Sequence, residues 1–200
     1  MKGTAFRLGI LACALAGVPA FGAIIIDFGT GAAGNGGTIV QSGSNATGTN
    51  ILIGSLNYQN GASNTTYTMS GLLSFNTAAN TISITGSIPT LGITSPITLL
   101  TGSFTSFSVA NPISNLIDVS GSGPDTKSAT LLTALGLPTT TQFAFFGFSI
   151  GGLNLGSTNT YTAVSTDISN SAVPEPTSII LLGTVVFGIS GLLRRRTTKA

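Results

Sequence analysis

Residues 65–85 read TTYTMSGLLSFNTAANTISIT and show the alternation of a β-hairpin. Apolar or small side chains occupy every second position from Tyr67 to Phe75, and mostly Thr and Ser lie between them. Because successive side chains of a strand point to opposite faces, this period of two predicts a strand with one buried face. The turn residues 76–80 and the alternating run 81–85 then complete an antiparallel pair.

Similar patterns recur outward from this hairpin in both directions. We expect further strands at Ala23–Phe28, Thr38–Gln41, Asn50–Tyr58, Ile97–Phe104, Thr105–Val109, Gln142–Ile150 and Thr160–Ile168. The segment 142–150 has apolar residues at odd and even positions, which predicts a central strand buried on both faces. Short strands separated by Gly and Asn turns indicate a mainly β fold, namely an antiparallel β-sandwich of jelly-roll-like type.

One short helix is expected to interrupt the strands. Asp125 can cap a helix over Thr126–Leu135, and Gly136 follows as its stop. Lys127 and Ser128 would then be adjacent helix residues whose side chains point apart, so we do not expect them to form a nucleophile and base.

The composition excludes several classes of function. Only 6% of the 200 residues are charged, and the chain has no His, no Trp and a single Cys. That Cys is Cys13, near the N-terminus, so the rest of the chain holds no disulfide, no Cys/His zinc site and no Ser-His-Asp or Cys-His triad. Between residues 23 and 176, Lys127 is the only basic residue, which argues against nucleic acid as a partner.

Few carboxylates are available for catalysis or metal binding. Asp118 and Asp125 are the pair that lies close in sequence, flanking an expected loop at 121–124. We interpret them as a turn acid and a helix cap, and we predict no catalytic residues, no cofactor and no metal site. Asp118 and Asp125 with Ser120 and Ser122 could supply some calcium ligands, but no complete calcium loop is present, so calcium dependence stays open.

The N-terminus has the pattern of a secretory signal peptide. Lys2 and Arg7 precede an apolar run at 8–18, and small residues occupy positions 20 and 22. This arrangement predicts export and cleavage after Gly22.

The C-terminus has three features in a fixed order. They are the motif Pro174, Glu175 and Pro176, the uncharged apolar run 179–193, and the basic residues Arg194, Arg195 and Arg196. A helix over 177–193 is marginally long enough to cross a membrane, and the arginines should remain on the cytoplasmic side. The body would then lie outside the cytoplasm.

This order of features resembles the PEP-CTERM sorting signal of Gram-negative bacteria, a tail also named after the C-terminal region of an ice-binding protein. The resemblance covers only residues 173–197. It implies that an exosortase-like membrane protease or transpeptidase recognises Pro174–Pro176, and that Arg194–Arg196 act as the stop-transfer basic cluster. The Thr-x-Thr pairs of the body have irregular spacing, so we do not expect ice binding.

The sequence therefore predicts four parts and a surface function. The parts are a signal peptide at 1–22, a β-sandwich body at 23–168, a linker at 169–172, and a sorting tail at 173–200 with its transmembrane helix at 177–193. We expect an exported structural or adhesive protein of the cell surface or the extracellular polysaccharide matrix, anchored in the inner membrane at least transiently. The alternative is a carbohydrate-binding module, for which Tyr58, Tyr67 and Tyr161 are the candidate stacking residues.

Overall fold

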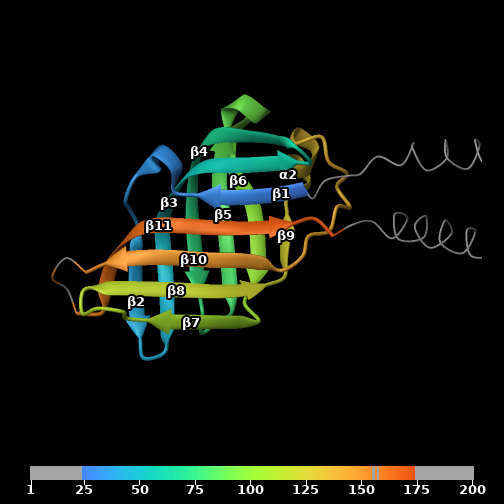
Figure 1. Cartoon of the computed structure of the whole chain (residues 1–200). Coiled ribbons are helices and arrows are strands. Elements are labelled where there is room, and N and C mark those ends of the chain that lie inside the picture. The colour runs from blue at the N-terminus through green and yellow to red at the C-terminus, as the bar shows by residue number, and fades with distance from the viewer. Residues whose placement is uncertain (1–23, 155, 157, 174–200) are drawn as a thin grey trace, which may run out of the picture.

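The structure is a computed structural model that describes residues 24–154, 156 and 158–173 (Figure 1). Strands and helices follow one another in these residues as β1 (Ile24–Gly29), η1 (Gly31–Ala33), β2 (Thr38–Ser42), β3 (Asn45–Asn60), β4 (Ser63–Asn76), β5 (Thr81–Ile88), η2 (Pro89–Leu91), β6 (Ile93–Ser103), β7 (Ser106–Ala110), β8 (Leu116–Gly123), β9 (Asp125–Lys127), α2 (Ala129–Ala134), β10 (Phe146–Leu153) and β11 (Thr160–Ser171). The elements η1 and η2 are single 3-10 turns. The prediction of a mainly antiparallel β fold with one short helix is confirmed.

The strands form two layers that belong to one continuous sheet. The hydrogen-bonded order is β7-β8-β10-β11-β1-β3-β4-β5-β6-β9, and β2 pairs with β11 and β3. In Figure 1 the strands β7, β8, β10, β11 and β1 lie in front, and strands from β3 to β6 run across them behind. The expected division into two separate sheets, as in a jelly roll, is not found among the described strands, because β1 and β2 connect the layers.

The core lies between the two layers and is built from the inward positions of the alternating strands. Four phenylalanines from two strands and one connection form its aromatic centre, with ring centroids 5.0–6.5 Å apart in edge-to-face contacts. They are Phe75, Phe104, Phe146 and Phe148. Such pairs add to the hydrophobic stabilisation of the buried rings.

The hairpin predicted at 65–85 is formed by β4 and β5. Phe75 lies opposite Ile82, and both are buried. In the turn, the Asn76 side chain accepts a hydrogen bond from the backbone N–H of Ala79 at 3.0 Å, and Asn80 has a positive φ of 55°. Asn tolerates this left-handed conformation better than most residues, which explains its position at the end of the turn.

Three predictions of local structure are wrong. Of the expected loop 121–124, residues 121–123 are the end of the strand β8, because Gly121 and Gly123 leave room for close neighbours. The helix begins only at Ala129, and its cap is Ser128, which accepts a hydrogen bond from the N–H of Leu131. The expected linker 169–172 continues β11 to Ser171 and then pairs Ala172 with Phe143.

The strand predicted at 142–150 is found at Phe146–Leu153, and its predicted burial on both faces is wrong. Strand β10 lies between β8 and β11, so it is central in the sheet. Phe146, Phe148 and Ile150 are buried, but Gly147 and Ser149 on the other face are exposed. Phe145 precedes the strand with 59% of its surface exposed.

The two ends of the described body lie side by side. The N–H of Ala172 donates a hydrogen bond to the carbonyl of Ile24 at 2.7 Å. The N-terminal and C-terminal ends of the described body therefore lie at the same edge of the molecule. Among the described residues no helix has both the length and the apolar character needed to cross a membrane, and the predicted helix at 177–193 lies outside them.

Candidate functional sites

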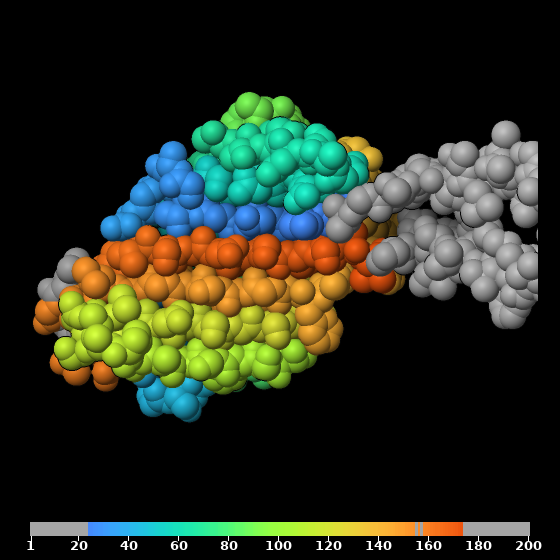
Figure 2. Space-filling view, in the orientation of Figure 1, coloured from blue at the N-terminus to red at the C-terminus, as the bar shows by residue number. Residues whose placement is uncertain are grey.

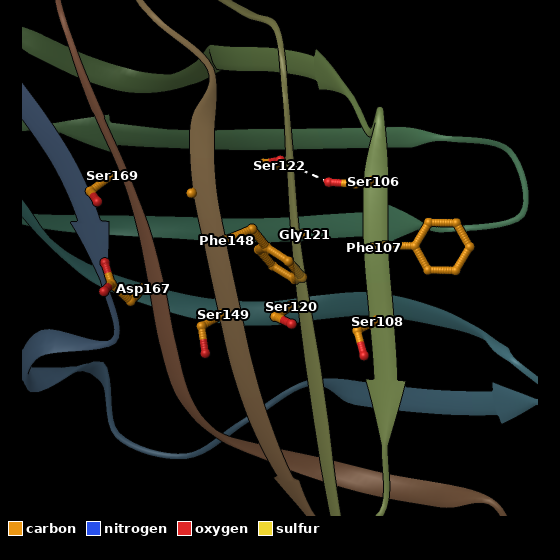
Figure 3. A pocket seen from close by; sticks show the side chains of 11 residues that line it. Ser106, Phe107, Ser108, Ser120, Gly121, Ser122, Phe148, Ser149, Asp167 and Ser169 are labelled. Atoms are coloured by element: carbon orange, nitrogen blue, oxygen red, sulfur yellow. Dashed lines mark hydrogen bonds between the residues drawn. The ribbon is translucent and has the colours of Figure 1, made fainter.

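The outer face of β7, β8, β10 and β11 is lined with serine, and we call it the serine face. Its members are Ser106, Ser108, Ser120, Ser122, Ser149 and Ser169, together with Asp167. The register aligns them in two rows, one of which runs from Ser108 through Ser120 and Ser149 to Asp167 (Figure 3). Alternation produces this face, because Val119, Phe148 and Ile168 between the polar residues point into the core.

The serine face is open and shallow. Its central depression has a volume of about 590 Å³, and the serine side chains labelled in Figure 3 come from neighbouring strands. Figure 2 shows the same strands as one continuous surface. Small hydroxyl groups at strand spacing can donate and accept hydrogen bonds over an extended area, but they enclose no small ligand.

Two carboxylates meet at the side of the serine face next to β1. Asp27 is opposite Ser169, and Asp167 is opposite Gly29, so the two acids are diagonal neighbours. Burial is the largest cause that raises the pKa of Asp27 to about 6, and the hydrogen bond and negative charge of Asp167 raise it further. Asn57 donates to Oδ2 of Asp27 at 3.4 Å, which opposes this shift.

Burial and the neighbouring Asp167 favour the protonated form of Asp27, because both raise its pKa. The buried Oδ1 of Asp27 has no hydrogen-bond partner among the described residues. Asp27 and Asp167 lie on the first and last strands of the body, so no local pattern in the sequence indicates that they are neighbours.

A second cluster is buried between β9 and β11 and contains the only Lys of the body. The Lys127 Nζ donates to Oδ2 of Asp125 at 2.6 Å and to Oδ1 of Asn170 at 2.5 Å. The amide nitrogen of Asn170 donates to the other Asp125 oxygen, Oδ1, at 2.7 Å. The three side chains therefore form a closed triangle of contacts.

Apolar surroundings shape the electrostatics of this triangle. The side chains of Lys127 and Asp125 have no exposed surface, and the Lys127 Nζ lies 4.1 Å from the centre of the Phe143 ring. Burial lowers the pKa of Lys127 to about 8, although the charge of Asp125 and its hydrogen bond act in the opposite direction. A fraction of the amine is therefore neutral near neutral pH, which makes it a nucleophile.

The structure separates Asp118 from Asp125, the two acids that lie close in sequence. Asp118 is exposed on β8, whereas Asp125 belongs to the triangle. The sequence predicts Lys127 as a helix residue, but in the structure it lies on the strand β9 and its side chain is buried. The feature of the sequence that could have pointed to Lys127 is that it is the only basic residue of the body.

Among the described residues no three His, Cys, Asp or Glu side chains gather as a metal site would require.

The candidate sugar-stacking tyrosines do not form an exposed row. Tyr161 is buried, and its hydroxyl joins Gln41 and Asn111 in a hydrogen-bonded ring that ties β2, β11 and the segment after β7 together. Tyr58 and Tyr67 are partly buried against the core.

The sorting residues Pro174, Glu175 and Pro176 and the arginines at 194–196 lie outside the described residues. A family model, the PEP-CTERM protein-sorting motif, matches residues 172–196. The chain carries a PEP-CTERM sorting motif. The motif marks an exported protein that is held transiently in a membrane, processed by an exosortase and sorted outward. Comparison with curated proteins and with solved structures found no match.

Proposed function

We propose that the body is a structural or adhesive component of the cell surface or extracellular polysaccharide matrix, delivered there by its PEP-CTERM tail. The serine face is the observation that carries this proposal. It is wide, open and rich in hydroxyl groups, so it offers many weak hydrogen bonds to a hydroxylated polymer rather than one tight pocket. The body itself would catalyse no reaction on a substrate.

The placement of the tail supports the same role. The body ends at the edge formed by β1 and β11, and the serine face extends from β11 toward β7, away from β1. A body attached through its C-terminal edge would keep β7 and β8 accessible to its surroundings.

Binding to extracellular polysaccharide tests this function. The variant Ser108→Ala/Ser120→Ala/Ser149→Ala removes three hydroxyls from one row of the serine face. Its retention on the purified polysaccharide should fall about tenfold, since each lost hydrogen bond costs about 0.5 kcal/mol. Equal retention of the variant and the wild-type protein would contradict the proposal.

The matched control lies on the other layer. Thr85→Ala/Thr98→Ala/Thr101→Ala removes three exposed hydroxyls from β5 and β6 and should leave retention unchanged. The alternative, a carbohydrate-binding module that stacks sugars on tyrosine, predicts the opposite pattern. In that case Tyr67→Ala would abolish retention, and the serine variant would behave as wild type.

A further inference from the structure

The buried triangle of Lys127, Asp125 and Asn170 brings a nucleophile, a proton carrier and an electrophile into mutual contact. We propose that Lys127 and Asn170 condense to an intramolecular isopeptide bond, with Asp125 transferring the proton and ammonia leaving. This covalent modification joins β9 to β11. It is a single event within the chain, and it is independent of what the serine face binds.

Position favours the attack of Lys127 on Asn170. The Nζ atom already contacts Oδ1 of the Asn170 amide, and the carbonyl carbon Cγ is one bond beyond that oxygen. The amide is held in place, since its nitrogen also donates to the carbonyl of Ala144 at 3.3 Å. Holding two reacting groups in such contact removes much of the entropic barrier of a reaction between them.

Asp125 is placed to move the proton that the reaction requires. One carboxylate oxygen contacts the attacking Nζ and the other contacts Nδ2, the atom that must leave. The lone pair of neutral Nζ forms the new bond to Cγ, and Asp125 accepts a proton from Nζ. Asp125 then returns a proton to Nδ2, the Cγ–Nδ2 bond breaks, and ammonia departs. The products are one secondary amide and one ammonia, with no oxidant or other reactant.

The apolar surroundings favour both the start and the end of this reaction. Burial keeps part of the amine neutral, and the Phe143 ring lies over Nζ, where positive charge develops as the bond forms. In the unreacted state, a desolvated ion pair carries a penalty that its attraction repays only in part. Amide formation removes the buried cation altogether.

The sequence allows a direct test with trypsin. Lys127 is the only Lys or Arg between residues 8 and 193. Trypsin recognises the charged side chain of Lys or Arg, and an acylated lysine has lost that charge. The exported mature chain should be purified, denatured and digested. We expect the wild-type body to stay in one piece across position 127, and its intact mass to lie one ammonia below the mass calculated from its sequence.

Three variants define the chemistry. Lys127→Arg keeps the charge and the cleavage site but cannot form the amide, and Asn170→Ala removes the electrophile. Asp125→Ala keeps both reactants but removes the proton carrier. Each should be cut after position 127 and show no loss of ammonia. The control Asn57→Ala, on β3 outside the triangle, should behave as wild type.

The tryptic digestion and the intact mass of the wild-type protein decide the test, so a variant that fails to fold does not weaken it. Wild-type chain that is cut after Lys127 and has its full calculated mass would overturn the proposal and leave a non-covalent network. Loss of ammonia with cleavage intact would also overturn it, because succinimide formation at an asparagine gives that mass without blocking trypsin. A cross-link that persists in folded Asp125→Ala would overturn the role of Asp125.

Discussion

At the scale of single residues, burial acts in opposite directions on the two ionisable groups of the body with clearly shifted pKa values. It raises the pKa of Asp27 to about 6 and lowers that of Lys127 to about 8. In both cases the low-dielectric surroundings disfavour the charged form. The neutral forms suit the adjacent side chains. A protonated Asp27 can donate a hydrogen bond to Asp167, and a neutral Lys127 can attack Asn170 in the proposed reaction.

The shift at Asp27 predicts a pH-dependent stability. Its folded pKa, about 6, lies above the unfolded value of 3.8, so the folded state binds the proton more tightly. The stabilisation is fully present below about pH 4 and is lost as the pH rises through 6. Asp27→Asn keeps an N–H donor toward Asp167 at all pH values. It should stabilise the protein by about 1 kcal/mol at pH 7, after allowance for partial exposure, and by little at pH 4.

Urea denaturation at the two pH values measures this difference. Asp118→Asn, a change at an exposed carboxylate on β8, is the control and should have no comparable effect. An Asp27→Asn protein that is less stable than wild type at pH 7 would show that the folded state does not favour the protonated form of Asp27.

At the scale of elements, close packing between strands depends on glycine in β8. A Cβ atom added to Gly123 would lie 1.8 Å from the carbonyl oxygen of Ser103, which belongs to β6. Gly123 thus marks the point where β8 of one layer approaches β6 of the other, and the carbonyl of Pro124 beside it accepts a hydrogen bond from the N–H of Ser103. The same glycine made this stretch look like a loop in the sequence.

Gly123→Ala should therefore destabilise the fold by about 3 kcal/mol, because backbone rather than a movable side chain meets the new methyl group. Gly147→Ala, on the neighbouring strand β10, is the control. There the nearest atom would be 3.8 Å away, so we expect a change within about 0.5 kcal/mol. Thermal unfolding of the two variants compares them. Similar melting temperatures would contradict the packing described for β8.

At the scale of the whole molecule, the body and its tail meet at one edge. The described chain ends at Val173, three residues after Asn170 and directly before Pro174. A force applied through the tail would act on the end of β11, close to the proposed Lys127–Asn170 bond. That bond would divert the load from the hydrogen bonds of β11 to β9 and the second layer, which suits a protein held at a surface by its C-terminus.

The sorting motif gives a prediction at this scale. Pro174→Ala/Glu175→Ala/Pro176→Ala should leave export intact, because the signal peptide predicted at 1–22 would act first. It should block release from the membrane, because the expected helix and Arg194–Arg196 still stop transfer. The unprocessed chain should then accumulate in the membrane fraction.

The mass of the mature protein provides the measurement. Processed wild-type protein should lack Arg194–Arg196, and the triple variant should retain them. If the wild-type protein still carries these arginines, the tail is a permanent anchor and the sorting interpretation fails.

The sequence by itself determined most of the strand pattern, the absence of His and Cys chemistry in the body, and the sorting tail. These properties are local: an alternation of period two, a composition, and a motif with a fixed order of residues. The 65–85 hairpin was predictable because its two strands and its turn are contiguous, so the register follows from the chain itself.

Only the tertiary structure decided which distant residues meet. The period of a strand tells which face a side chain is on, but it does not tell which strand becomes its neighbour. Asp27 meets Asp167 because the first and last strands pair, and Lys127 meets Asn170 because β9 packs near the end of β11. Both clusters join residues far apart in sequence, and a polar residue gains its chemistry from the neighbours that long-range packing supplies.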